Sequence, residues 1–231
     1  MTYVLGYFVA DGCIAVRKDR KKSPYVFNIT SADKKHLEKL RKAMSSNHAI
    51  SAKSRGGSTK KSYYQLQISN QIIAKDLINL GILPRKTYNL DFIKVPKRYF
   101  PDFVRGFFDG DGTVYIYTVN STPQIKASFV SSSYDFIDKL NNNLCKNLNT
   151  PLKTIHKENK KDKLPRYTIN FYIDDCKKLA EFMYKNNPLL YLPRKYKIFQ
   201  KWDSINRREY RKVNYPSKIG WQLNKKVSVN N

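Results

Sequence analysis

Hydrophobic and polar residues alternate along several short segments of the chain, a pattern typical of strands that bury one face. Tyr25, Phe27 and Ile29 occupy alternate positions, and the same alternation returns in residues 124–130 and 166–173. The residues between the apolar ones are mostly polar. Each segment is therefore predicted to place one face in a core and to leave the other face open.

Hydrophobic residues at helical spacing separate these strands, and the elements fall into two units with the same order. Predicted strands span residues 13–18, 25–30, 51–55 and 63–69 in the first unit, and 113–119, 124–130, 152–157 and 166–173 in the second. Predicted helices begin near Ser31 and Ser133, which are plausible N-caps, and span residues 71–80 and 175–185. With an opening helix, each unit has the order αββαββα. This order predicts an α+β fold with a four-stranded, mostly antiparallel, curved sheet in each half and helices on one face.

An internal repeat supports the two-unit interpretation. YVLGYFVADG, residues 3–12, returns as FVRGFFDGDG in residues 103–112, and LPRK in residues 83–86 returns in residues 192–195. We therefore expect a first half in residues 1–95, a linker in 96–101, a second half in 102–205 and a basic C-terminal extension in 206–231.

The charge of the chain indicates a polyanionic partner. Lysine and arginine outnumber aspartate and glutamate by 44 to 18, which gives a net charge of +26 spread along the sequence. The three cysteines form no C-x-x-C pair, and His36, His48 and His156 have no metal-ligand spacing. No apolar run is long enough to cross a bilayer, and no leader is visible at the N-terminus. These features predict a soluble, intracellular protein and leave its compartment open.

The repeated decapeptide has a pattern that favours close helix packing. Gly6 and Ala10 lie four residues apart, as do Gly106 and Gly110, so each helix presents a stripe without large side chains. The glycine that follows each helix suits the left-handed conformation with which many helices end. The sequence therefore predicts two motif helices in contact along their backbones.

Close packing of these helices would bring Asp11 and Asp111 together at the negative ends of two helix dipoles. Only a cation makes such an arrangement favourable. Carboxylate oxygens suit magnesium, which keeps several waters and accepts phosphate oxygens as further ligands. For one copy alone, ordinary helix packing and an ordinary Asp-Gly turn would be the better interpretation. Because the same motif occurs twice with the same elements after it, the metal site becomes the better interpretation.

The two motifs resemble the pattern of the double-motif LAGLIDADG homing endonucleases, or meganucleases, which aligns with Val4–Gly12 and Val104–Gly112. The resemblance extends through about Trp202. It implies a monomer with pseudo-twofold symmetry, with the motif helices at the interface and the two sheets forming a DNA-binding saddle. The implied activity is intron homing by site-specific, metal-dependent cleavage of both DNA strands across the minor groove. The target would be long and asymmetric, and the products would carry short 3′ overhangs.

The resemblance also assigns site residues. Asp11 and Asp111 would hold magnesium with the backbone carbonyls of Ala10 and Gly110, and Mn²⁺ or Ca²⁺ would substitute in binding. The repeated LPRK makes Lys86 and Lys195 the candidates for orienting water or stabilising the transition state, with Lys197 as a rival for the second. The first motif departs from the family pattern at Val9, where the second copy keeps Asp109. We interpret Asp109 as a supporting residue.

Outward residues of the strands are the candidates for DNA contact, because a two-stranded ribbon fits the major groove. In the first half these are Arg17, Asn28, Thr30, Lys53, Arg55, Gln65 and Gln67. In the second half they are Tyr115, Tyr117, Gln124, Lys126, Ser128, Arg166, Thr168 and Asn170. About half of such candidates are expected to make no base contact.

Two alternatives remain open at this point. One is a non-catalytic nucleic-acid binder on the same fold, such as an intron RNA maturase or a transcription regulator, with intron RNA as a partner. The other is a basic assembly protein, which predicts no function for the matched aspartates. Both retained carboxylates argue against these alternatives, because a pure binder has no use for their mutual repulsion.

Overall fold

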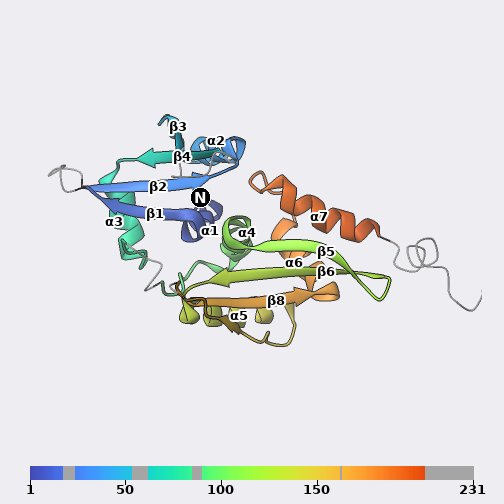
Figure 1. The fold of residues 1–231 in the computed structure, drawn as a ribbon. Coiled ribbons are helices and arrows are strands. Elements are labelled where there is room, and N and C mark those ends of the chain that lie inside the picture. The colour runs from blue at the N-terminus through green and yellow to red at the C-terminus, as the bar shows by residue number, and fades with distance from the viewer. Residues whose placement is uncertain (18–23, 54–61, 85–89, 162, 206–231) are drawn as a thin grey trace, which may run out of the picture.

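The protein contains two four-stranded sheets with a pair of helices between them (Figure 1). The computed structural model describes residues 1–17, 24–53, 62–84, 90–161 and 163–205. None of the described helices is long and apolar enough to cross a membrane.

The two halves have the same succession of elements. The first half comprises α1 (Thr2–Asp11), β1 (Gly12–Val16), β2 (Tyr25–Ser31), α2 (Lys34–Ala43), β3 (Ile50–Lys53), β4 (Tyr63–Ile68) and α3 (Gln71–Asn79). A short 3-10 turn, η1 (Lys97–Tyr99), leads into the second half. This half comprises α4 (Phe100–Asp111), β5 (Thr113–Val119), β6 (Thr122–Ser131), α5 (Tyr134–Leu148), β7 (His156–Glu158), β8 (Arg166–Tyr172), α6 (Ile173–Tyr184) and α7 (Pro193–Ser204).

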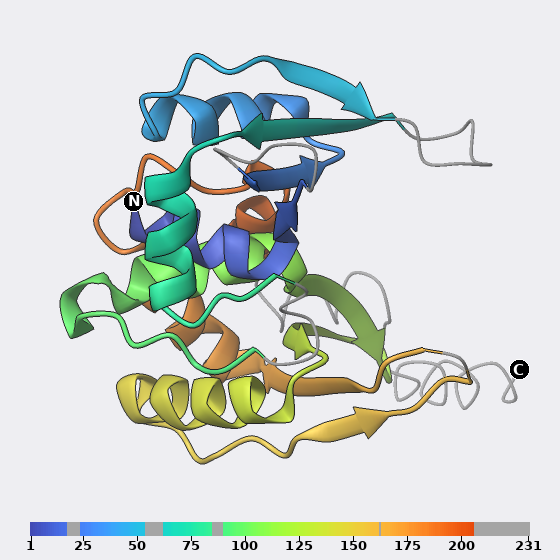
Figure 2. The same cartoon turned by 90° about the vertical axis from the view of Figure 1, so that its left-hand side faces the viewer.

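Each sheet is antiparallel throughout, with the strand orders β1-β2-β4-β3 and β5-β6-β8-β7. The α+β class with two equivalent sheets, predicted from the repeat, is confirmed. Helices α2 and α3 pack on the first sheet, and α5 and α6 pack on the second. Figure 2 shows α1 and α4 between the two sheets.

Aromatic side chains fill the layer between the helices and the sheets. The rings of Phe8 and Phe27 stack with their centroids 4.2 Å apart in the first half. In the second half, the ring centroids of Phe108 and Phe129 lie 5.1 Å apart. All four side chains are buried. Phe8 and Phe108 are related by the 100-residue offset of the motifs, so the repeat places a phenylalanine of each motif helix in the core.

The contact between α1 and α4 is the most extensive between any two helices of the described chain. A side-chain carbon added at Gly6 would overlap the carbonyl oxygen of Phe103, and one added at Gly106 would overlap that of Tyr3. The two contacts are related by the same offset as the motifs. The helices therefore touch backbone to backbone about a pseudo-twofold axis, as the small-residue stripe predicted.

The structure corrects the prediction for the glycines that end the motif helices. Gly12 and Gly112 are extended, with φ values of −92° and −77°, and not left-handed. At both positions the backbone instead continues directly from the helix into a strand. An added side-chain carbon would overlap the ring of Phe8 or Phe108. Glycine is needed here for space, because the phenylalanine ring occupies the place of a side chain.

Other boundaries also differ from the prediction. Helix α2 begins at Lys34 with Asp33 as its N-cap, because Ser31 belongs to β2. Ser133 does cap α5, accepting a hydrogen bond from the Phe136 amide. The expected 96–101 linker is too long, because α4 already begins at Phe100. The order αββαββα omitted α7, and the expected C-terminal extension, residues 206–231, lies outside the described part.

The glycine contact predicts a large loss of stability when a side chain is introduced at the interface. Gly106→Val should lower the free energy of unfolding by about 3 kcal/mol or more, because the backbone atoms of the facing helix cannot move aside locally. Asn142→Val, at an exposed position of α5, is the matched control and should change stability by less than about 1 kcal/mol. Urea unfolding followed by circular dichroism would measure both. Equal midpoints for the two variants would contradict the close packing.

Candidate functional site

The motif aspartates meet where α1 and α4 end. A side-chain carbon added at Gly110 would overlap the Ala10 methyl group and lie 3.6 Å from the Asp11 amide nitrogen. Ala10 and Gly110 are thus in direct contact across the axis, and the residue after each is an aspartate. Asp11 and Asp111 are both exposed. The structure therefore brings the two predicted carboxylates to one solvent-accessible place between the sheets.

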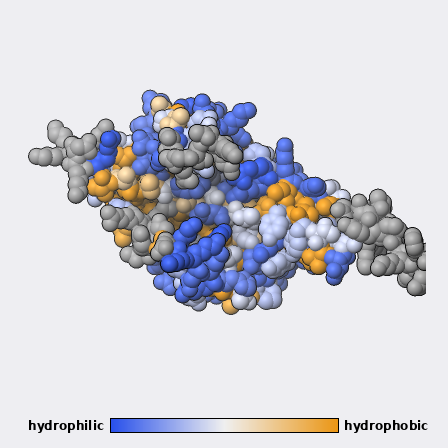
Figure 3. All heavy atoms as spheres, in the orientation of Figure 1, coloured by the Kyte–Doolittle hydropathy of each residue, from blue (hydrophilic) through white to orange (hydrophobic). Residues whose placement is uncertain are grey.

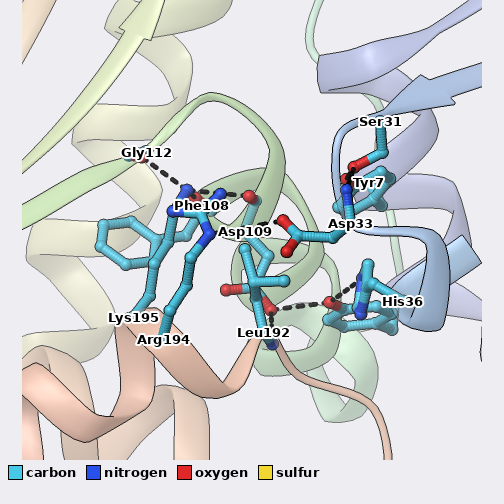
Figure 4. A network of polar contacts seen from close by, with 11 residues as sticks. Tyr7, Ser31, Asp33, His36, Phe108, Asp109, Gly112, Leu192, Arg194 and Lys195 are labelled. Carbon is cyan, nitrogen blue, oxygen red and sulfur yellow. Dashed lines mark hydrogen bonds and ion pairs between the residues drawn. The ribbon is translucent and has the colours of Figure 1, made fainter. Parts of the chain in front are cut away.

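Lys195 supports the second of these helix ends. Its ammonium group donates to the carbonyl oxygens of Phe108, Asp109 and Gly112 at 2.6, 2.8 and 2.6 Å (Figure 4). Three donors thus meet three acceptors, and the side chain is 5% exposed. Burial lowers the pKa of Lys195 to about 8, against the raising effect of the Asp109 charge. Lys195 is thus buried against the end of α4, whereas Lys197 on the same helix is exposed.

Asp109 joins the two halves through a buried chain of hydrogen bonds. Its Oδ2 atom accepts from the Tyr3 hydroxyl at 2.6 Å and from the Leu192 amide at 2.8 Å. The Tyr3 oxygen lies 3.0 Å from Nε2 of His36, near the start of α2. Tyr3 gives its only proton to Asp109, so Nε2 of His36 must donate to the Tyr3 oxygen. Asp109, on α4, is therefore hydrogen-bonded both to α1 and to the residue that precedes α7.

Burial affects the charge state of the residues in this hydrogen-bond network. It lowers the pKa of His36 to about 4, so the imidazole is neutral near pH 7. It also raises the pKa of Asp109, while the Tyr3 hydrogen bond opposes that change. Val9, at the corresponding position of α1, is a buried apolar residue. The two halves therefore differ in the polar support of their motif helices.

The donor set at the helix ends fits a hard divalent cation. Two carboxylates, one from each half, come together beside the carbonyl ends of two helices, so oxygen atoms dominate the site. Among the described residues there is no group of three or more histidine, cysteine or acidic side chains that could hold a metal by itself. A cation at this place would therefore complete its coordination with water or with oxygens of a bound partner.

The pairing register places every described DNA-contact candidate in the strands on one face of its sheet. Thr30 faces Gln65 across β2 and β4, and in the second half Ser128 faces Asn170. Arg17 and Lys53 are exposed at the edges of the first sheet. Lys86 and Arg55 lie outside the described residues.

A groove of about 480 Å³ follows this face of the second sheet. It is lined by Thr113, Tyr115, Lys126, Ser128, Val130, His156, Lys157, Glu158, Arg166, Thr168, Asn170 and Tyr172. Six of these are predicted contacts. Tyr117, also predicted, lies next to the groove with its ring centroid 5.7 Å from that of Tyr115.

Some candidates form the floor of the sheet face and do not project from it. Ser128 donates to Asn170 Oδ1 at 2.7 Å, and both side chains are buried. Asn28, at the equivalent position of the first sheet, is 5% exposed. These side chains lie on the predicted strand face but are buried in it, and their contact with DNA stays a prediction.

The prediction missed His156, Glu158 and Tyr172. The strand containing the first two was expected over residues 152–157 but spans only three residues, ending at Glu158. Tyr172 follows the predicted alternation of 166–173, in which Arg166, Thr168 and Asn170 were chosen and this aromatic residue was not. Strand alternation alone would have found it.

Comparisons with known proteins agree with this geometry. Residues 1–80 match the model of the LAGLIDADG-like domain, and residues 104–206 match the model of the LAGLIDADG endonuclease. The two matches cover most of the chain, one for each half. The protein belongs to the LAGLIDADG family. Comparison with curated proteins gives no match.

Solved LAGLIDADG structures share the fold of both halves. The chain superposes on the homing endonuclease I-GzeII in complex with its DNA target with a TM-score of 0.57 and 14% identity, covering 100% of this chain and 97% of that one. The meganuclease I-AabMI, bound to uncleaved DNA, gives 0.57 and 15%, with 100% of each chain covered. I-SmaMI gives 0.55 and 14%, covering 97% and 96%. At such identities the likeness shows the fold of a two-domain LAGLIDADG protein.

The three hydrogen bonds of Lys195 predict a structural cost when its charge is removed. Lys195→Met should lower the free energy of unfolding by about 2–4 kcal/mol, because buried carbonyls lose a charged donor. Lys197→Met is the matched control and should leave stability within about 0.5 kcal/mol of the wild type. Denaturant unfolding of both variants would measure the difference. Wild-type stability of Lys195→Met would contradict the buried arrangement.

Proposed function

We propose that this LAGLIDADG protein is a site-specific, double-strand DNA endonuclease in which Asp11 and Asp111 hold divalent metal at the centre of the DNA-binding face. The observation that carries the proposal is the meeting of the two aspartates at the ends of α1 and α4. One carboxylate comes from each half, at a place that both sheets flank. An arrangement with two related halves suits a substrate with two antiparallel strands.

Charge and shape support DNA as the substrate. The net charge of +26 favours a polyanion, and the aligned strand faces carry lysine, arginine, amide and tyrosine side chains. Figure 3 shows a surface that is largely hydrophilic, with hydrophobic residues in separate patches. The structural relatives I-GzeII and I-AabMI were both solved with DNA. A single chain supplies both halves, so a monomer would suffice.

Magnesium, with Mn²⁺ or Ca²⁺ as substitutes in binding, would supply polarisation of the scissile phosphate and stabilisation of the leaving oxygen. The chain contributes the carboxylates of Asp11 and Asp111, with the backbone carbonyls of Ala10 and Gly110 as further candidates. The sheets orient the duplex so that one scissile phosphate of each strand lies near the axis. Cleavage across the minor groove would leave short 3′ overhangs at a long, asymmetric target.

We assign Lys195 a positioning role. Its three donors already bind backbone carbonyls at the end of α4, so a water or phosphate would have to replace one of them. Holding the α4 end in place also holds Asp111. Lys86, from the first copy of LPRK, and the exposed Lys197 remain the candidates for direct contact with the reacting phosphates.

The metal assignment predicts that cleavage and binding separate. Asp11→Asn and Asp111→Asn should each lower the cleavage rate by at least about 100-fold, because loss of metal coordination removes stabilisation of the transition state. DNA affinity should change by less than about tenfold, because the strand faces are intact. Asp76→Asn, an exposed residue of α3, is the matched control and should leave both properties unchanged.

The measurement starts with a plasmid library that carries randomised sites, incubated with and without magnesium. Sequencing the ends of linear products identifies the target, and gel shifts with that target give the affinity. Magnesium-dependent breaks at one long site support the proposal. Tight binding of DNA or RNA without cleavage by the wild type would replace it with a maturase-like binding function. Full cleavage by the double aspartate variant would remove the metal assignment.

A further inference from the structure

A carboxylate lies on the basic strand face of the second sheet, at a distance from the motif aspartates. Among the residues that the structure describes, Glu158 is the only acidic side chain lining the groove of that sheet. The charged side chains around it in the groove are Lys126, Lys157 and Arg166. A carboxylate on a surface that binds phosphates weakens binding by repulsion. A favourable contact between this carboxylate and the bound molecule would offset that repulsion.

Glu158 is paired in register with Arg166. The two residues lie directly opposite each other in β7 and β8, so their side chains stand on the same face of the sheet. Their side chains are 50% and 53% exposed. The Nη1 atom of Arg166 is 3.9 Å from Oε2 of Glu158, which is too long for a hydrogen bond. Neither group is therefore fully committed to the other.

Lys160 lies closer to the carboxylate, with its Nζ atom 3.1 Å from Oε1 of Glu158. This lysine is itself 59% exposed, so the contact is a solvated ion pair of small energy. Such a pair orients Glu158 without removing its second oxygen from the groove. The face thus presents a carboxylate acceptor and a guanidinium donor side by side.

These two groups match the two halves of one base pair. In the major groove, guanine offers the acceptors N7 and O6, which arginine binds with two donors, and cytosine offers an N4 donor, which a carboxylate accepts. Opposite residues of an antiparallel pair have their side-chain origins roughly 5 Å apart, close enough to reach both bases of one pair. An adenine–thymine pair would present an acceptor to the carboxylate or leave the arginine with one partner.

We propose that Glu158 and Arg166 together read one C·G base pair in the half of the target bound by the second sheet. Glu158 accepts a hydrogen bond from cytosine N4, and Arg166 donates to guanine. The inference rests on the proposed function, since it names the base pair that one part of the DNA-binding face selects. The carboxylate lowers general affinity and adds selectivity.

The test compares base preference at every position of the target. Wild-type full-length protein and the variants Glu158→Gln, Glu158→Ala and Arg166→Ala are each bound, in Ca²⁺, to a library in which the second half-site is randomised. Sequencing of the bound fraction gives the preferences, and fluorescence anisotropy with single-base variants gives the affinity ratios. Glu38→Gln is the matched control, since it removes the same charge at an exposed position of α2.

The three variants should reduce the preference for C·G by about tenfold at one shared base pair and leave the other positions unchanged. Glu38→Gln should change no preference. The inference is overturned if both Glu158 variants raise affinity for all sequences equally, as removal of a negative charge alone would do. It is also overturned if the Glu158 and Arg166 variants affect different positions. A wild-type protein without any sequence preference on duplex DNA would instead overturn the proposed function.

Discussion

The backbone contact between α1 and α4 is the constraint on which the molecule depends. Gly6 and Gly106 each lie against a carbonyl of the facing helix, so a side chain at either position would separate the halves. The same contact sets the place of Ala10 against Gly110, and with it the meeting of the two motif aspartates. Stability and the candidate metal site therefore rest on one interface. A substitution that loosens it should affect both.

The support of this interface differs between the halves. Asp109 links the second motif helix to Tyr3 of the first half and to the chain before α7, and Lys195 binds the end of the same helix. In the first half the place of Asp109 is taken by the buried Val9. The two copies of the repeat thus differ in the hydrogen bonds that support the motif helices, while the glycine contacts between these helices remain symmetric. An asymmetric molecule of this kind would suit the asymmetric target of the proposed function.

The strand faces divide polar residues into two kinds. Near the motif helices, Ser128 and Asn170 bond to each other and are buried, so they shape the floor of the groove. Farther along β8, Arg166 stands half-exposed opposite Glu158. A residue of the first kind affects recognition through the position of its neighbours. A residue of the second kind can reach a base directly, which is why the proposed C·G contact lies there.

The two-unit α+β fold was predictable from the amino-acid sequence, because the repeat and the alternation of apolar residues report local periodicity. The sequence also indicated the helix contact, because small residues four apart allow few other arrangements. The surroundings of each side chain, in contrast, follow from how the elements pack in three dimensions. The burial of Lys195, the extended conformation of Gly112 and the pairing of Glu158 with Arg166 depend on segments far apart in the chain. Local patterns carry no information about such neighbours, since burial and hydrogen bonding arise when separate elements pack together.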